Sequence, residues 1–415
     1  MKKTMSPRSE DSSFMAENKW LQYIAFASVP LVLVLGNSML VPILPDLAKQ
    51  MKLSELQSSL VITLFSVSAA VFIPAIGYLS DRFRRKAIII PALAVYGAAG
   101  IVAGFAAIWG SYWLLISSRA LQGLAAAGTA PIAMALVGDM YKDGQESEAL
   151  GIVEASNGAG KVVSPILGSL LALIVWYAPF FAFPVFCAAS LLAVWFFIKE
   201  PESKSEPLKL KPYLADMKKI FREKGRWLIT AYCTGALGLF LLFGVLFYLS
   251  DLLEKPPYSI DGVLKGCILA IPLLGLVITA YLTGHSIKKD GKKMRRCILI
   301  GLSLMSAALI GCLFSYWLIY VFIGFITISS VGTGLLLPCL NTWITGSVDT
   351  THRGIVTSFY NSLRFLGVAA GPPLFSWLAD RSVTALFILL AVLAIVALLF
   401  AIRLLHPEKT ANPAS

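Results

Sequence analysis

Charged side chains are scarce in this sequence. Asp, Glu, Lys and Arg make up 14% of the 415 residues, whereas 57% of the residues are hydrophobic. A soluble domain carries roughly 25% charged residues, so the composition excludes an ordinary soluble protein and predicts a membrane protein. The basic residues behind the net charge of +12 lie mainly in loops on one side of the apolar runs, and we therefore expect no nucleic-acid partner.

Histidine and cysteine are rare as well. The three histidines, His285, His352 and His406, all lie outside the apolar runs, which argues against a metal site or a histidine proton relay inside the membrane. The six cysteines all lie within apolar runs. We therefore expect buried free thiols rather than disulfides or metal ligands.

Motifs for catalysis are missing too. The sequence has no Gly-x-x-x-x-Gly-Lys-Ser/Thr loop, the motif that cradles the phosphates of a nucleotide. It also shows no nucleophile–base pair and no cluster of metal ligands. We therefore expect no enzyme, no bound cofactor and no direct use of ATP.

Long apolar runs, by contrast, fill the chain. Crossing a bilayer core of ~30 Å takes ~20 apolar residues. Twelve runs of this kind cover about residues 21–44, 58–79, 87–108, 112–137, 151–175, 179–198, 227–249, 263–283, 297–314, 317–345, 355–379 and 384–404. Residues 1–19 are polar and the first run is too long for the core of a signal peptide, so we expect no cleavable signal.

Lysine and arginine are concentrated in the loops on the side of residues 1–19. Cytoplasmic loops of membrane proteins carry an excess of these residues. The distribution therefore predicts a multi-pass protein of the cell membrane with both termini in the cytoplasm.

The two halves of the chain resemble each other. The offset that carries Gly77 onto Gly284 also superimposes several separated residues of the same type: Pro131 on Pro338, Gly160 on Gly367, Pro165 on Pro372 and Leu167 on Leu374. One gap-free offset with several matches indicates an internal repeat, as in transporters built from two parallel halves. The predicted units are a tail (1–20), a six-helix bundle (21–198), a linker (199–226), a second bundle (227–405) and a tail (406–415).

The linker contains apolar residues at helical spacing, with basic residues between them, over residues 213–222. This pattern predicts an amphipathic helix that lies on the anionic inner leaflet. The alternative is a plain solvated linker.

The loop from Gly77 to Lys86 reads Gly-Tyr-Leu-Ser-Asp-Arg-Phe-Arg-Arg-Lys. It resembles Gly-x-x-x-Asp-Arg-x-Gly-Arg-Lys, the loop between helices 2 and 3 of the major facilitator superfamily, except that Arg84 replaces the Gly. The resemblance implies an all-α fold of twelve transmembrane helices in two pseudo-symmetric bundles. It also implies a conformational latch in which Asp81 faces the start of span 11. In that latch Arg85 or Arg82 pairs with an acid after span 4, and the predicted members are Gly77, Asp81, Arg82, Arg85, Lys86 and Asp139.

The fourth span contains Arg119, Gln122 and Gly123 in the order Leu-x-x-x-Arg-x-x-Gln-Gly. This resembles the fourth-helix motif of the same superfamily, and the resemblance links Arg119 to proton coupling. An Arg inside a span costs at least ~2.5 kcal/mol and stays charged, so it needs acceptors or a wet cavity. The alternative is an Arg that reaches back to the outer interface.

The first span ends in Leu-Gly-Asn37-Ser followed by Pro42 and Pro45. It resembles the first-helix signature of twelve-span drug:proton antiporters, and its prolines are expected to interrupt the helix. Asn37 either contacts the substrate or bonds to a neighbouring helix. Asp46 is a second candidate proton carrier.

The fifth span places Glu154, Asn157 and Lys161 on one helical face. Glu154 is the main candidate proton carrier because it is the one acid clearly within a span. Alternatively, Glu154 and Lys161 pair for stability alone. Ser164-Pro165-Ile-Leu-Gly168 departs by one residue from the Gly-Pro-x-x-Gly of the superfamily's antiporters. The residues expected to let helices pack closely are Gly158, Gly160, Pro165, Gly168, Gly367, Gly371 and Pro372.

Span 11 carries Asn361 and Arg364, and Arg364 falls on the repeat position of Asn157. Arg119, Lys161 and Arg364 then oppose one deep acid, Glu154, so the predicted central cavity is positive and suits an anion. The predicted cavity residues are Asn37, Arg119, Asn157, Lys161, Asn361 and Arg364.

Together these patterns predict proton-coupled export of a small organic molecule by alternating access. The substrate could be anionic, siderophore-like or a drug. The alternatives are uptake or facilitated diffusion of an organic anion, and a non-transporting membrane sensor, for which the linker is too short to be an output domain. The expected partners are the substrate, protons and membrane lipid, and we expect a monomer.

Overall fold

The computed structural model describes residues 7–141, 143–200, 210–287, 290–347 and 350–406. Within these ranges every regular element is a helix, which agrees with the predicted all-α fold. The first half contains α1 (Pro7–Ser38), the 3-10 helix η1 (Val41–Ile43), α2 (Leu44–Met51), α3 (Glu55–Arg82), α4 (Arg85–Ile108), α5 (Tyr112–Ala126), α6 (Ala130–Met140), α7 (Asp143–Ala172) and α8 (Ala178–Phe197). The second half contains α9 (Leu210–Glu254), α10 (Gly262–Ile287), α11 (Gly291–Ser315), α12 (Ile319–Gly346), α13 (Thr350–Ala379) and α14 (Val383–Leu404).

Most helix ends follow signals that are visible in the sequence. Ser54 begins α3 with a capping box: its hydroxyl accepts from the Gln57 amide at 3.1 Å, and the Gln57 side chain accepts from the Ser54 amide at 2.9 Å. These two bonds satisfy amides that the first turn of a helix leaves without partners. Pro42 and Pro45 stand in the first turns of η1 and α2, so the first span is divided near its end.

The fourth span is also divided. We predicted one helix over residues 112–137, but α5 ends at Ala126 and α6 begins at Ala130. Thr129 between them has a non-helical backbone, and Pro131 stands in the first turn of α6. In a continuous helix Pro131 could not donate to the carbonyl of Ala127, four residues earlier, and its ring would clash with that carbonyl. Proline is well accommodated in a first turn, which accounts for a break followed directly by a new helix.

The linker segment 213–222 is helical, as predicted, but it is continuous with the next span. The segment 213–222 does not form a separate helix, because α9 continues without a break from Leu210 into the seventh span. No proline occurs after Pro212 within this helix to end it. Residues 201–209 lie outside the described ranges, and location on the membrane surface stays a prediction.

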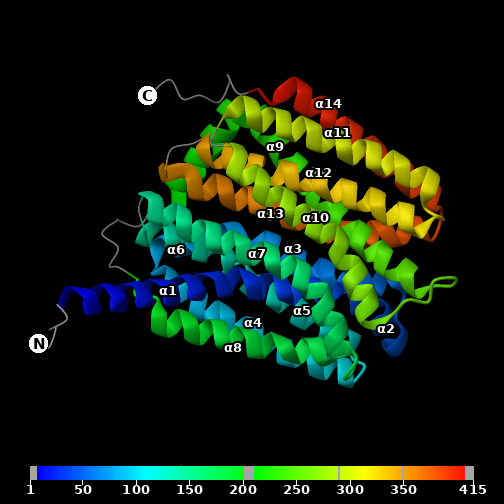
Figure 1. The fold of residues 1–415 in the computed structure, drawn as a ribbon, viewed down its shortest axis with the longest axis horizontal. Helices are drawn as coiled ribbons and strands as arrows, with labels where there is room; N and C mark the ends of the chain where they lie inside the picture. Colours follow the sequence, from blue (N-terminus) through cyan, green and yellow to red (C-terminus); the bar gives the residue numbers. More distant parts are fainter. Residues whose placement is uncertain (1–6, 142, 201–209, 288–289, 348–349, 407–415) are drawn as a thin grey trace, which may run out of the picture.

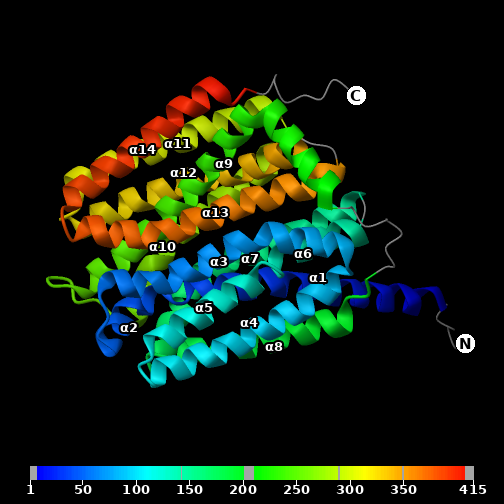
Figure 2. The same cartoon turned by 180° about the vertical axis from the view of Figure 1, so that it is seen from behind.

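The helices run roughly side by side, with α1 to α8 grouped below α9 to α14 in Figure 1 and both chain ends at one end of the molecule. We call this the terminal end and the opposite one the far end. Figure 2 shows the same grouping from behind. The two groups meet mainly where α3 packs on α13 and α7 packs on α10.

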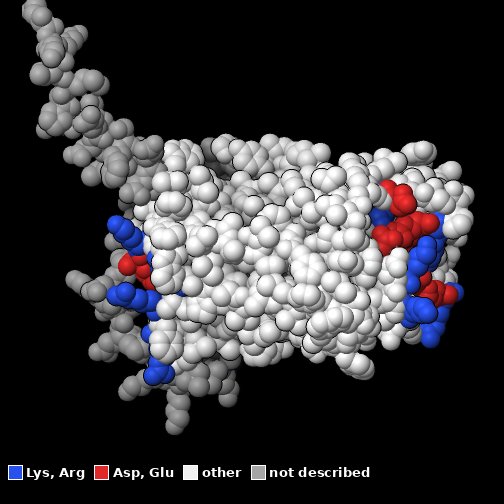
Figure 3. All heavy atoms as spheres, turned by 90° about the horizontal axis from the view of Figure 1, so that it is seen from below, with Lys and Arg blue, Asp and Glu red and all other residues white. Residues whose placement is uncertain are grey.

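Ten helical segments of the described chain are long and apolar enough to cross a membrane. The remaining long helices, α7 and α13, have 30 residues each and carry the polar side chains of spans 5 and 11. In Figure 3, Lys, Arg, Asp and Glu gather at the two ends and the band between them is free of charge on that face. This distribution is that of a multi-pass membrane protein.

Residues that the internal repeat relates to each other make similar helix–helix contacts in the two halves. A Cβ added to Gly160 of α7 would lie 3.0 Å from Leu31 of α1, and one added to its repeat mate Gly367 of α13 would lie 2.2 Å from the carbonyl oxygen of Ala236 on α9. The two residues therefore occupy the same kind of contact, in which a small residue lets two helices approach.

All six cysteines are free thiols, as predicted. The expectation that all are buried is wrong for Cys233 and Cys267, which are exposed. They lie on the helices α9 and α10, and a span of apolar residues predicts membrane depth without showing which face of the helix is covered.

Candidate functional site

Arg119 of α5 is fully buried, at 0% exposure. Its Nε donates to the carbonyl oxygen of Val61 at 3.1 Å, and its terminal nitrogens donate to the carbonyl of Gly36 and the Oδ1 of Asn37, each at 3.2 Å. A further bond joins it to Gln122 one turn along α5. The expected alternative, an Arg119 that reaches the membrane surface, is wrong, because helices α1 and α3 enclose it.

The charge of Arg119 is balanced by dipoles rather than by an acid. In the part of the chain that the structure describes, the hydrogen-bond partners of Arg119 are carbonyl and amide oxygens, and its guanidinium lies 4.6 Å from the centre of the Phe65 ring. Asn37 thus uses its Oδ1 to join α1 to α5. In this conformation Arg119 and Asn37 form a structural cluster, and their use by a substrate stays a prediction.

Lys161 of α7 lies within electrostatic range of both Glu154 and Arg364. Glu154 is exposed, and Asn157 approaches its Oε1 at 3.5 Å, which is the upper limit for a hydrogen bond. Among the described residues, no ion pair of 4.0 Å or less joins Glu154 to Lys161. Lys161 of α7 and Arg364 of α13 therefore act on each other's charge, and their joint use as a substrate site stays a prediction.

The guanidinium of Arg364 on α13 has hydrogen-bond donors that are not all used. One terminal nitrogen approaches the Oδ1 of Asn361 at 3.4 Å, and the guanidinium lies 5.4 Å from the centre of the Tyr360 ring. Its buried Nε has no hydrogen-bond partner among the described residues. Buried donors are almost always paired, so this guanidinium retains capacity to bind an acceptor.

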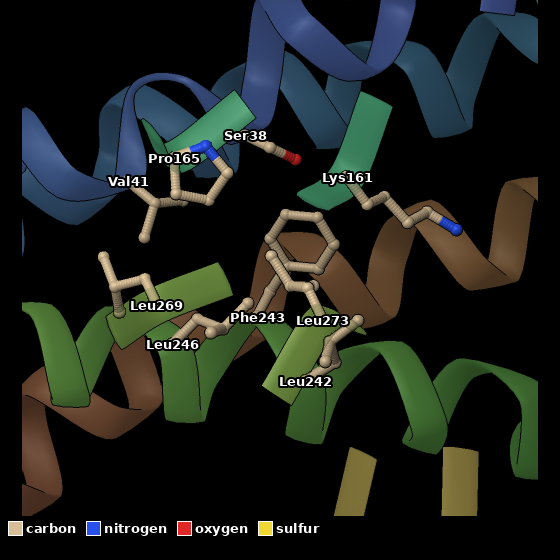
Figure 4. A pocket seen from close by; sticks show the side chains of 9 residues that line it. All are labelled: Ser38, Val41, Lys161, Pro165, Leu242, Phe243, Leu246, Leu269 and Leu273. Atoms are coloured by element: carbon tan, nitrogen blue, oxygen red, sulfur yellow. The ribbon is translucent and has the colours of Figure 1, made fainter. Parts of the chain in front are cut away.

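A small cavity lies between the two halves beside Lys161 (Figure 4). Its volume is about 10 Å³, which is room for about one water molecule. It is lined by Ser38, Val41, Lys161, Pro165, Leu242, Phe243, Leu246, Leu269 and Leu273. The ammonium of Lys161 points away from the other lining side chains. The halves are therefore closed on each other here, and an organic molecule fits only after they move apart.

The predicted latch lies at the terminal end. Arg85 forms an ion pair with Asp139 of α6 and donates to the hydroxyl of Ser80 at 3.2 Å. A Cβ added to Gly77 would lie 2.8 Å from the hydroxyl oxygen of Ser358 on α13, so glycine permits the approach of α3 to α13. The structure does not describe the side chain of Asp81, and Arg82 is exposed.

Two further contacts of this loop join it to α8. The ammonium of Lys86 donates to the carbonyls of Trp195 and Ile198, both at 2.7 Å, at the end of α8. Glu200 accepts from the amides of Arg85 and Lys86 at 2.7 and 2.9 Å, at the start of α4. The ammonium of Lys86 therefore lies at the negative end of the α8 dipole, and the carboxylate of Glu200 lies at the positive end of the α4 dipole. Both placements are stabilising. Sequence analysis missed Glu200, although an acid directly after span 6 was a usable signal.

The far end holds a second group of acids and bases, near the candidate proton carrier Asp46. Lys265 is only 2% exposed and forms an ion pair with Glu254. Asp46, in the first turn of α2, acts electrostatically on Glu254. The two predicted proton carriers therefore do not share a site, because Glu154 belongs to the group around Lys161.

Comparison with known proteins identifies the family. Residues 26–289 and 243–415 both match the sequence profile of the Major Facilitator Superfamily. This chain belongs to that superfamily. The bacillibactin exporter of Bacillus subtilis (strain 168) is 43% identical to it over 391 residues, which cover 93% of this chain and 97% of the exporter. Multidrug resistance protein 2 of the same organism is 24% identical over 385 residues, or 91% of this chain and 93% of that protein.

Solved structures share the fold. The human organic anion transporter MFSD10 (TETRAN) superimposes with a TM-score of 0.73 at 20% identity, over 92% of this chain and 99% of that one. Superfamily membership confirms the resemblance found in the Gly77–Lys86 loop and the all-α transporter fold. The protein is a multi-pass membrane transporter of small molecules and not an enzyme.

Proposed function

We propose that the protein exports an anionic, siderophore-like small organic molecule across the cytoplasmic membrane in exchange for protons. The observation that carries the proposal is Arg364, whose buried Nε has no partner among the described residues and whose charge acts on Lys161 of the other half. Two cations with one nearby acid leave positive charge that an anion can neutralise. The 43% identity to a bacillibactin exporter supports both the direction of transport and the substrate class.

An anion between α7 and α13 would draw the halves together. Charge-assisted hydrogen bonds from Lys161 and Arg364 to its oxygens are stronger than neutral ones. Because one cation comes from each half, the anion contributes most when both halves close on it. The cavity of about 10 Å³ belongs to a conformation without room for that molecule, as alternating access requires for one stage of the cycle.

Glu154 is the proposed proton carrier. It is exposed and lies within electrostatic range of Lys161. An anion bound at Lys161 would compete with the carboxylate of Glu154 for that ammonium, and this competition would link substrate binding to the proposed proton carrier. Asp46 is the second candidate, and Arg119 contributes a fixed positive charge.

We further propose that both termini are cytoplasmic, that basic side chains at the terminal end contact anionic lipid and that the transporter is a monomer.

Purified protein in liposomes tests this function, with bacillibactin as the anionic probe and ethidium as a cationic control. We expect bacillibactin to accumulate in liposomes whose lumen is more acidic than the bath, and ethidium to accumulate much less. Accumulation no greater than in protein-free liposomes would contradict transport of this probe. Accumulation that ignores the pH gradient would contradict antiport and favour facilitated diffusion.

A further inference from the structure

Lys255, directly after α9, connects the two halves at the far end. Its ammonium lies 2.8 Å from Oε1 of Glu55, the first residue of α3, and 2.6 Å from Oδ2 of Asp251. The contact with Glu55 joins the second half to the first. The contact with Asp251 stays within one turn of the second half. One ammonium therefore binds two carboxylates, of which only one spans the interface.

Other contacts close the same end. The hydroxyl of Ser250 on α9 donates to the carbonyl of Val41 in η1 at 3.1 Å, and both residues are buried. A Cβ added to Gly266 of α10 would lie 2.7 Å from the carbonyl oxygen of Pro165 on α7. The far ends of α3, η1 and α7 thus all contact the second half.

The terminal end is less tightly closed on the side of α7 and α10. A Cβ added to Gly158 would still lie 3.0 Å from Val277. Two turns closer to the terminal end, on the same helix faces, Cβ atoms added to Gly151 and Gly284 would meet no atom of the described residues within 4 Å. The α3–α13 contact at Gly77 persists, so the separation is confined to one side. The molecule is closed at the far end and begins to part at the other.

The charges around Lys255 favour its ion pair with Glu55. Burial lowers the pKa of Lys255, but its bonds to Asp251 and Glu55 outweigh this effect and raise the pKa overall, so the ammonium is retained. Burial, and then the negative charge of Glu55, raise the pKa of Asp380 in the turn before α14. Figure 3 shows that acidic and basic side chains gather at the far end.

We propose that Glu55 and Lys255 form the far-end gate of this transporter, a pair that must separate each time the central site opens to that side. In alternating access the far end opens once in every cycle, and this is the ion pair within the described chain that joins the halves there. The proposal depends on the transporter fold and not on the identity of the substrate.

Labelling of a buried position beneath the gate tests this. Val41 is 3% exposed, and it takes part in the Ser250 contact through its backbone, so Val41→Cys keeps that bond. The measurement is the rate at which a membrane-impermeant maleimide labels the Val41→Cys variant in intact cells. This rate reports how often the far end opens. The same protein without Val41→Cys gives the background from the natural cysteines. Loss of a partly exposed ion pair removes about 0.2–1 kcal/mol, so Glu55→Gln should accelerate labelling by up to about fivefold.

Asp251→Asn is the matched control, because it removes the other carboxylate from the same ammonium without breaking a contact between halves. Its labelling rate should stay close to that of the parent, as should that of Lys49→Met, which removes an exposed lysine on α2. If Glu55→Gln expresses poorly, Lys255→Met removes the same pair from the other side. Equal rates in Glu55→Gln and Asp251→Asn, or no acceleration in Glu55→Gln and Lys255→Met, would overturn the proposal.

Discussion

Lys161 of α7 and Arg364 of α13 lie near enough for the charge of one to act on the other, although both are cations. They come from helices that the internal repeat relates to each other, one in each half. Like charges repel, and among the described residues Glu154 is the acid whose charge acts on Lys161. An anionic substrate would supply the missing negative charge, which is the central claim of this account.

Glu154→Gln should uncouple transport from the pH gradient. The amide keeps the size of the side chain but cannot exchange a proton, so the gradient no longer drives accumulation while downhill movement continues. Accumulation of bacillibactin in acid-loaded liposomes measures the first process, and efflux without a gradient measures the second. Accumulation at the wild-type level would exclude Glu154 as the carrier and leave Asp46 as the candidate.

Arg85→Gln should reduce transport strongly without preventing insertion. Arg85 pairs with Asp139 and donates to Ser80, so its loss releases the loop that holds α3, α4 and α6 together. Asp81→Asn should have the same effect if Asp81 faces the start of α13. Initial transport rates, normalised to membrane protein, measure the effect. Arg82→Gln is the control, because Arg82 is exposed on the same loop; an equal loss in that variant would point to topogenic charge rather than a latch.

Gly168→Ala should destabilise the fold. The added Cβ would lie 2.2 Å from the carbonyl oxygen of Met39, so α7 must move away from the end of α1. Overpacking of this kind costs about 1–3 kcal/mol. The apparent melting temperature in detergent should fall relative to Gly151→Ala, where an added Cβ meets no atom of the described residues within 4 Å. Identical melting temperatures in the two variants would contradict the packing role.

The fold was largely predictable because its signals are local. Apolar runs mark the spans, and the offset from Gly77 to Gly284 marks the two halves. The break before Pro131 was missed because hydropathy continues across it, whereas backbone geometry does not. The continuity of α9 was missed because the polarity of residues 213–222 suggested a boundary where no residue ends the helix.

Within the site, residues close in sequence were the most predictable. Arg119 and Gln122, three residues apart on one helical face, form a hydrogen bond. The enclosure of Arg119 by Val61 and Gly36, and the contact of Glu55 with Lys255, join segments far apart in the chain. No pattern within the sequence connects such positions, and only the packing of helices brings them together.

Substrate binding to the wild type, Lys161→Met and the double variant Lys161→Met/Glu154→Gln tests the anion site most directly. A charge-assisted hydrogen bond is worth ~1.5–3 kcal/mol, so Lys161→Met should weaken bacillibactin binding by roughly 10- to 100-fold. Lys161→Arg should retain part of the affinity because it retains the charge. If Lys161 binds the anion, the double variant should bind as weakly as Lys161→Met. Recovery of wild-type affinity in the double variant would contradict the account and show that Lys161 serves only to neutralise Glu154.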